Sequence, residues 1–347
     1  MLYDLVTETV HVLNPSAGLV WEACDGVIDL AQVVSPVVEA TGAAWDQVAT
    51  DVEACVDQLA DAGLVARTVD APEPPPIERT AVDGARTGAV HAVLDDGVCF
   101  RGDDGGLLAA IDGLLGDDDG RPVTIELGVR EDGGAVRLRG WGPERAYGSR
   151  EAFLDALPTT LNQIAAASSH CIALHAGCVR AATGEVLLLP AVSGSGKTTL
   201  TAALIQAGWD YATDEAVGVR AGSLTAVAYP KPLVLDPSSR AVLGLGPVAS
   251  PNASPADLRD DVSVLRGDVG PVTRVVLPRY EAGASTVLEM LDPRAAIVGI
   301  LEHALNLGRV GQPGLDALCQ LALTVPVQRL VHGSVESAVG ALGWSPS

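Results

Sequence analysis

The stretch AVSGSGKTTL, residues 191–200, follows the apolar run EVLLLP and leads into the helix-like run TLTAALIQAG. It fits the phosphate-loop template G-x-x-x-x-G-K-[ST] at Gly196, Lys197 and Thr198. Ala191 stands where the template has its first glycine. Backbone N–H groups can surround phosphate oxygens only in conformations that glycine adopts at least cost. The stretch therefore predicts a strand, a phosphate-binding loop and a helix in an α/β domain; the alternative is a chance glycine-rich loop.

The chemistry of this loop assigns a role to each polar residue. Lys197 is expected to neutralise the β- and γ-phosphates, the Thr198 hydroxyl to ligate Mg²⁺, and the helix N-terminus to add positive charge. The predicted cofactors are ATP and Mg²⁺, although GTP or pyrophosphate stays open as the donor. The predicted nucleotide-binding residues are Ser193, Gly194, Ser195, Gly196, Lys197, Thr198 and Thr199.

Two adjacent acids, Asp214 and Glu215 in DYATDEAVG, follow a short apolar strand 17 residues after Lys197. Neighbouring side chains on a strand point to opposite faces, so both acids can reach one ligand only where the strand ends. One carboxylate is then expected to hold the metal and the other to accept a proton from an attacking hydroxyl. The alternative is an ordinary Walker-B aspartate with a solvated neighbour.

His175, in LHAG, lies on a strand that we expect beside the phosphate strand. A histidine there could pair with Asp214 and tune its pKa. Taken alone, a histidine in this position is more often a core or edge residue. His303 and Asn306, in LEHALN, could also reach the site, and helix packing is the alternative for both.

Composition shifts divide the chain into four parts. Residues 68–80, TVDAPEPPPIERT, contain four prolines and three acids without apolar periodicity, which favours an extended linker. Between residues 81 and 170 we expect two hairpins, turning at Asp-Asp-Gly and Asp-Gly-Gly, and a helix interrupted by proline. From Cys171 the pattern alternates strands and helices to VQRLVHG. The predicted divisions are 1–67, 68–80, 81–170 and 171–347.

The net charge of −22 bears on the partners that the chain can bind. A uniformly acidic surface repels nucleic acid and anionic membrane, so we expect neither as a partner. A basic peptide or protein would be favoured, but solubility alone explains such a balance. No apolar run reaches the roughly 18 residues of a membrane span. Asp4 and Glu8 stand where a signal peptide carries positive charge, so we expect a cytoplasmic protein.

The six cysteines include no C-x-x-C pair. Cys171 and Cys178 lie seven residues apart around an apolar stretch, which is not a usual zinc spacing. We therefore expect all six to be small buried hydrophobic residues in a reducing compartment.

LHAG, VSGSGKTTL and TDEAVG, in this order and spacing, resemble the HPr serine kinase/phosphorylase family over residues 171–335. The resemblance implies a phosphate-loop α/β fold allied to phosphoenolpyruvate carboxykinase, and transfer of a phosphoryl group from ATP to serine. It implies that Asp214 is the catalytic base, that His175 pairs with it, and that Glu215 is the neighbouring carboxylate. The family pattern has glycine at 191 and aspartate at 215, where this chain has Ala191 and Glu215.

The segment VAYPKPLVLDPSSR resembles the proline-basic stretch of the related kinases. There Lys231 is expected to meet substrate or phosphate, and solvation of a surface lysine is the alternative. Members of the parent family form hexamers, so a homo-oligomer is open.

The first block has a resemblance of its own. LNPSAGLVWEACDG and DVEACVDQLADAGLV, within residues 8–66, are similar to the PqqD family of small winged-helix-like domains, which recognise the leader of a precursor peptide. Such domains bind by strand addition, in which an exposed sheet edge pairs with an extended leader. Within the block we expect Trp21 and Leu13 to belong to the core rather than to a contact surface.

Together, the two halves suggest a kinase that phosphorylates a Ser or Thr hydroxyl of a ribosomally made precursor peptide, whose leader residues 1–67 capture. One alternative is a regulatory serine kinase of a folded carrier protein, whose activity would not need residues 1–70. Another is a nucleotide-gated peptide-delivery protein that binds ATP without transfer. A small-molecule kinase would leave the leader-binding module without a role.

Overall fold

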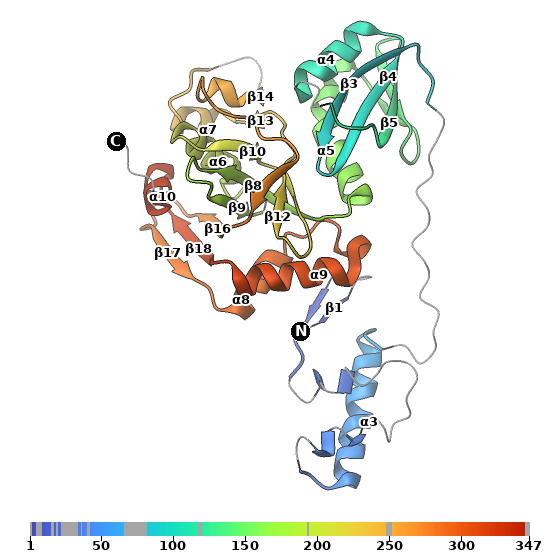
Figure 1. Cartoon of the computed structure of the whole chain (residues 1–347), viewed down its shortest axis with the longest axis vertical. Helices are drawn as coiled ribbons and strands as arrows, with labels where there is room; N and C mark the ends of the chain where they lie inside the picture. The colour runs from blue at the N-terminus through green and yellow to red at the C-terminus, as the bar shows by residue number, and fades with distance from the viewer. Residues whose placement is uncertain are drawn as a thin grey trace. The chain divides into compact units, whose positions relative to one another are not determined.

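The chain forms two compact units, Met1–Pro76 and Ile77–Ser347, in the computed structural model (Figure 1). The linker predicted at residues 68–80 falls outside the residues that the structure describes. Those described are residues 2–4, 9–14, 17–18, 20–21, 34–35, 37–39, 42–65, 82–116, 120–192, 194–247 and 252–343.

The longest helix among the described residues of the first unit is α3 (Trp45–Asp61). Val48, Val52 and Leu59 are buried, and they share one face of α3 because they are spaced by about one and two turns. Strands β1 (Leu2–Asp4) and β2 (Thr9–His11) pair antiparallel. The core of this unit contains Val20, Val34, Val37, Val48, Val52 and Leu59.

Two apolar residues near the start of this unit have different environments. Leu13 packs against the core, as predicted. Trp21 is 37% exposed, so the prediction that it belongs to the core is wrong. Between them, the side chain of Asn14 accepts a hydrogen bond from the N–H of Ala17 at 2.8 Å.

The second unit is an α/β domain with mixed sheets, and it opens with a five-stranded sheet in the order β3-β4-β5-β6-β7. Both predicted hairpins are present in this sheet. The first turns at Leu94–Asp95, one residue before the predicted turn, and the second turns at Gly133–Gly134. Its elements are β3 (Arg86–Val93), β4 (Asp96–Gly102), α4 (Gly105–Leu115), β5 (Ile125–Asp132), β6 (Ala135–Arg139), β7 (Arg145–Tyr147) and α5 (Arg150–Ser168).

The helix α5 is continuous, although Pro158 lies inside it. Proline removes one backbone hydrogen bond, but Phe153 and Leu157 are fully buried against the sheet and hold the helix in place. Where α5 ends, the Ser169 hydroxyl and the N–H of His170 both donate to the carboxylate of Asp95. The five-stranded sheet is therefore attached to the start of the next sheet.

The second sheet has nine strands in the order β15-β12-β11-β8-β9-β16-β18-β17, and β10 also pairs with β8. β9, β16 and β18 run parallel, whereas β8 is antiparallel to both β9 and β11. The carboxyl ends of β9, β16 and β18 therefore meet at one edge. The strands are β8 (Ile172–Arg180), β9 (Val186–Pro190), β10 (Asp210–Thr213), β11 (Ala216–Val219), β12 (Thr225–Val227), β15 (Asp268–Pro271), β16 (Arg274–Tyr280), β17 (Val287–Met290) and β18 (Val327–His332).

Helices cover both faces of this sheet (Figure 1). Leu187, Val276 and Leu330 share one hydrophobic cluster with α6 and α10, whereas Leu277, which points the other way from Val276, contacts Gly299 of α8. The stretch RAAIVGILEHALNL, which its apolar pattern predicts to be one helix, is helical only as far as Leu301, and α9 begins at its last residue, Leu307. The helices are α6 (Lys197–Gln206), α7 (Pro237–Val242), α8 (Pro293–Leu301), α9 (Leu307–Thr324) and α10 (Val335–Ala341).

A short excursion between β12 and β15 completes the fold. Strands β13 (Leu233–Val234) and β14 (Asn252–Ala253) pair antiparallel, and a 3-10 turn follows at Pro255–Asp257. Of the described helices, none combines the length and the apolar character that a crossing of a bilayer requires.

Candidate functional site

The loop between β9 and α6, residues 191–196, is called the glycine loop below. Gly194 and Gly196 have φ angles of 82° and 85°, in the left-handed region that other residues avoid. Gly196 is the N-cap of α6, and no described side chain caps that end of the helix. The first N–H groups of a helix lack intrahelical partners, so the start of α6 can receive an anion.

Ser195 adds an unsatisfied hydroxyl to the glycine loop. Its Oγ is buried and has no hydrogen-bond partner among the described residues. Buried polar atoms are rarely left unpaired, so this hydroxyl fits a site where a ligand oxygen completes the hydrogen bonding. Ser193, predicted as a further loop ligand, lies outside the described residues.

The first turn of α6 directs its side chains toward different neighbours. The Nζ of Lys197 is buried and donates to the main-chain oxygen of Asp214 at 2.6 Å. Burial lowers the pKa of Lys197, and the nearby carboxylates only partly oppose it. The Thr198 hydroxyl lies close enough to the Asp214 carboxylate to help lower the pKa of that group. The Thr199 hydroxyl instead shares a hydrogen bond of 2.8 Å with the Ser239 hydroxyl of α7, so its side chain connects α6 to α7.

Asp214 lies just beyond the end of β10, as predicted, and is only 1% exposed. Its Oδ1 is 2.9 Å from the Nζ of Lys231 and accepts from the Tyr211 hydroxyl at 3.2 Å. Burial alone would raise the pKa of Asp214, but Lys231 and Lys197 outweigh it and hold the pKa below its usual value. The carboxylate is therefore charged and enclosed.

Lys231 is the buried counterpart of that carboxylate. Its side chain is 2% exposed, so the alternative of a solvated surface lysine is wrong. Burial works to lower the pKa of Lys231, yet Asp214 and Glu215 raise it above its usual value. The ammonium group thus faces the acidic pair and not the solvent.

Glu215 and His175 form the more open part of the site. The carboxylate of Glu215 is 33% exposed, and its Oε1 lies 3.6 Å from the Nδ1 of His175. The same Nδ1 lies 3.0 Å from the main-chain oxygen of Glu215. His175 was predicted to pair with Asp214, but the structure places Glu215 beside it. Burial and then the Lys197 charge lower the pKa of His175, which favours the neutral imidazole.

An open pocket of about 680 Å³ lies at the carboxyl edge of the sheet, between the glycine loop and the elements β16 and α8. His303 lines it, and its main-chain oxygen accepts from the N–H of His175 at 2.8 Å. Burial lowers the pKa of His303 to about 4, and His175 and Lys197 add to the effect. Asn306 instead bonds the backbone of Ala173 and Cys171, which agrees with the packing alternative.

The oxygen atoms at this edge are the kind of ligands that bind a Mg²⁺ ion shared between the protein and a phosphate group. Thr198, Asp214 and Glu215 supply one hydroxyl and two carboxylates in adjacent positions. Mg²⁺ usually binds one or two carboxylates and completes its shell with water and phosphate oxygens. Among the described residues, no group of three or more His, Cys, Asp or Glu is placed to hold a metal ion.

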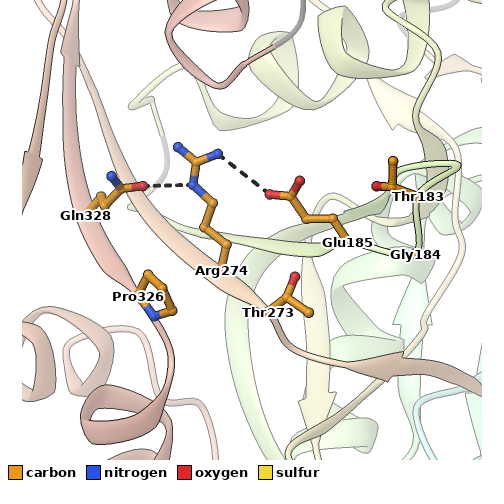
Figure 2. A pocket seen from close by; sticks show the side chains of 7 residues that line it. All are labelled: Thr183, Gly184, Glu185, Thr273, Arg274, Pro326 and Gln328. Carbon is orange, nitrogen blue, oxygen red and sulfur yellow. Dashed lines mark hydrogen bonds and ion pairs between the residues drawn. The ribbon is translucent and has the colours of Figure 1, made fainter.

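A second pocket, of about 560 Å³, lies at the opposite edge, where β9, β16 and β18 begin (Figure 2). The Nε of Arg274 donates to Gln328 at 2.7 Å, and its guanidinium lies 3.6 Å from the carboxylate of Glu185. Arg274 also donates to the main-chain oxygen of Leu342 at 3.1 Å. The charged group in this pocket is already partnered within the chain, so the carboxyl edge is the better candidate.

Several residues at the carboxyl edge were missed by the sequence reasoning. Tyr211 encloses Asp214, and Tyr229 is fully buried with a hydroxyl that has no partner among the described residues. For two of them the sequence does contain a signal, because Arg279 and Tyr280 directly follow the apolar residues of β16. They therefore lie at the same edge of the sheet as the glycine loop. The residues that line the pocket and were not predicted include Arg279, Tyr280, Arg294 and Arg329.

Comparison with known families adds a finding for the first unit. Residues 1–65 match the model of the family described as coenzyme PQQ synthesis protein D (PqqD). The chain thus begins with a PqqD-like domain, from a family whose members bind the leaders of precursor peptides. The match points to a protein associated with the biosynthesis of ribosomally made, modified peptides, with a precursor peptide as its partner. A comparison with curated proteins found no match for the chain.

Proposed function

We propose that this chain is an ATP-dependent kinase that phosphorylates a Ser or Thr hydroxyl of a ribosomally made precursor peptide. The observation that carries the proposal is the convergence of the glycine loop, Lys197 and the pair Asp214–Glu215 at one edge of the sheet. The resemblance of these motifs to the HPr serine kinase family supports a phosphate-loop kinase fold. The PqqD-like domain supplies the reason for a peptide acceptor.

The glycine loop would bind the donor phosphates. The uncapped start of α6 offers backbone N–H groups, and the unpaired hydroxyl of Ser195 offers one more donor. The Nζ of Lys197, which donates to the Asp214 main-chain oxygen, would move to the β- and γ-phosphates. There its positive charge would neutralise part of the phosphate charge. Thr198 and Glu215 would hold Mg²⁺, which when bound neutralises charge on the phosphates.

The transfer step needs an oriented hydroxyl more than a strong base, because the transition state of phosphoryl transfer is loose. The acceptor oxygen forms a bond to the γ-phosphorus while the bond from that phosphorus to the leaving oxygen of ADP breaks. The hydroxyl proton passes to a carboxylate, for which Asp214 is our candidate. Lys231 holds Asp214 in its charged form and in one position. The products are ADP and a phosphopeptide.

The first unit would contribute affinity and not chemistry. Capture of the leader turns the encounter between the peptide core and the kinase site into an intramolecular event, with an effective concentration set by the connecting segment. A peptide that lacks its leader should therefore be a much poorer substrate.

One observation favours a second candidate, a nucleotide-gated delivery protein without transfer. Asp214 is 1% exposed and paired with Lys231, so it meets a hydroxyl only if its surroundings open. A protein that only binds ATP would not need that opening.

The deciding experiment measures phosphate transfer from labelled ATP to a precursor peptide by the wild type and by Asp214→Asn. We expect transfer by the wild type, its loss in Asp214→Asn, and ATP binding within a few-fold of wild type in the variant. A wild type that binds ATP and the peptide but transfers nothing would support the delivery protein. Equal rates with and without the leader would support a regulatory kinase of another protein.

A further inference from the structure

The pocket beside the glycine loop has a cationic wall. Leu277 and Arg279 lie on the same face of β16, and Arg329 is paired with Leu277 across the parallel strands. Arg294 comes from the first turn of α8. All three arginines line the pocket and are exposed. The chain has a net charge of −22, so these three arginines form a positive patch on an otherwise acidic molecule.

Two of these guanidinium groups are uncommitted. Arg279 lies 2.7 Å from the carboxylate of Glu281, but Arg294 and Arg329 have no hydrogen bond or ion pair with any described residue. Of the two acids in the pocket wall, Asp292 is occupied in capping the N–H of Ala295 at 2.9 Å. The cationic charge is therefore available to an anionic ligand.

An aromatic ring stands where this wall meets the glycine loop. Tyr280 is 51% exposed, and its ring packs against the His332 ring at an interplanar angle of 61°, with 5.7 Å between centroids. A Cβ placed on Gly196 would lie 3.6 Å from the Cβ of Tyr280, so the tyrosine adjoins the start of α6. One ring face backed by a second ring is a good platform for a planar base.

The position of the acidic pair decides which end of the donor this pocket would meet. Asp214 and Glu215 lie on the β8 side of β9, and β16 lies on the other side. The attacking and leaving oxygens are roughly in line across the transferred phosphoryl group. An acceptor hydroxyl beside Asp214 therefore places the leaving part of the donor toward β16 and α8.

We propose that the pocket between the glycine loop, β16 and α8 binds the nucleoside part of the phosphate donor, with its base on Tyr280 and its α-phosphate and ribose at Arg294 and Arg329. This inference rests on the proposed function and makes the donor a nucleotide, not pyrophosphate. The volume of about 680 Å³ lies within the range of pockets for small ligands. Leu277, Pro278 and Val298 give the pocket the apolar floor that a base requires.

The test uses the full chain and two probes, Mg²⁺ with ADP and Mg²⁺ with inorganic pyrophosphate, in calorimetric titrations. We expect Tyr280→Ala to weaken ADP about tenfold, the usual effect of losing a stacked base, and to change pyrophosphate less than twofold. Tyr280→Phe keeps the ring and should bind ADP as the wild type does. Arg294→Ala combined with Arg329→Ala should weaken ADP more than pyrophosphate. Arg137→Ala, at an exposed arginine of the five-stranded sheet, is the matched control.

Each contrary result has a distinct meaning. Equal losses for ADP and pyrophosphate in Tyr280→Ala, or no loss for either, would overturn the nucleoside subsite while leaving a kinase intact. Loss of precursor-peptide binding in the double arginine variant, with ADP unchanged, would assign the pocket to an acidic acceptor segment and overturn the inference. A wild type that binds neither probe would refute the proposed function itself, and the subsite with it.

Discussion

The pockets at the two ends of β9, β16 and β18 resemble each other in size but not in the state of their polar groups. At the amino edge, where these strands begin, Arg274 donates a hydrogen bond to Gln328 and lies near the carboxylate of Glu185 (Figure 2). Its positive charge is therefore already paired within the chain. At the carboxyl edge, Arg294 and Arg329 have no partner among the described residues, and the Ser195 hydroxyl is buried without one. Unsatisfied polar groups, and not volume, distinguish a binding site from a structural hollow.

The largest effect should come from Lys197→Met. Methionine keeps the length of the side chain but removes the charge that we assign to the β- and γ-phosphates. We expect the rate of phosphate transfer to fall by about 10³-fold, the order of effect seen when a charged group of a transfer site is lost. The rate is measured with labelled ATP, and Arg274→Gln at the other edge is the control. A variant of Lys197 that keeps a tenth of the activity would contradict the assignment.

Lys231→Met should have the largest effect on stability. It leaves the carboxylate of Asp214 buried without its counter-ion, and breaking one partner of a buried pair costs about 3–5 kcal/mol. The free energy of unfolding, measured in urea, gives the loss. Combining the change with Asp214→Asn removes the orphaned charge and should restore a large part of the stability. If the double variant is no more stable than Lys231→Met, the buried pair is not the cause.

Gly196→Ala should lower both stability and nucleotide affinity. The φ angle of 85° disfavours any side chain by about 1–2 kcal/mol, and the nearest atom to an added Cβ, at 3.6 Å, is in ordinary contact. Strain and not collision is therefore the cause. Unfolding in urea measures the loss, and Gly184→Ala, in the amino-edge pocket at φ 90°, is a matched control that should destabilise without weakening ADP.

Arg274→Gln tests the prediction that the pocket at the amino edge is structural and does not bind nucleotide. Removing the guanidinium breaks its bonds to Gln328 and Leu342, which should cost about 1–2 kcal/mol of unfolding free energy. The dissociation constant for ADP should stay within twofold of the wild type. A larger change in ADP affinity would mean that the two edges are coupled through the strands.

The smallest effect concerns the protonation of His303. Burial holds its pKa at about 4 in the folded chain, whereas an unfolded histidine titrates near 6.5. Between these values the unfolded chain binds the extra proton, so stability is lost as the pH falls from about 6.5 toward 4. His303→Asn should flatten this part of the curve of unfolding free energy against pH. An unchanged slope would show that His303 is not the source, and would leave His175 and His332, whose pKa values burial also lowers.

The sequence anticipated the parts of this molecule whose signal is local. The strand–loop–helix of residues 186–206 follows from an apolar run, two glycines and a helical run, and both hairpins follow from their turn residues. The position of β8 beside β9 followed from the short turn that joins them. The continuous α5 was not anticipated, because burial of its apolar face outweighs the effect of Pro158.

Features that depend on distant segments could not be read from the sequence. Lys231 was expected to meet substrate or phosphate, and its pairing with Asp214 was not anticipated because only the fold brings the two together. The arginines of the pocket come from β16, α8 and β18, and no local pattern connects them. The partner of His175 depends on the register of β8 and β11, which sets His175 opposite Ala216 and so beside Glu215.

The central strand β8 has a consequence for how the molecule moves. It is hydrogen-bonded to β9 on one edge and to β10 and β11 on the other, and nearly all of it is buried. Its amide hydrogens should be among the slowest to exchange with heavy water, because their release requires separation of strands on both sides. The backbone of His175 is thus a fixed reference, and entry of a ligand must be accommodated by side chains such as that of Lys197 and not by movement of β8.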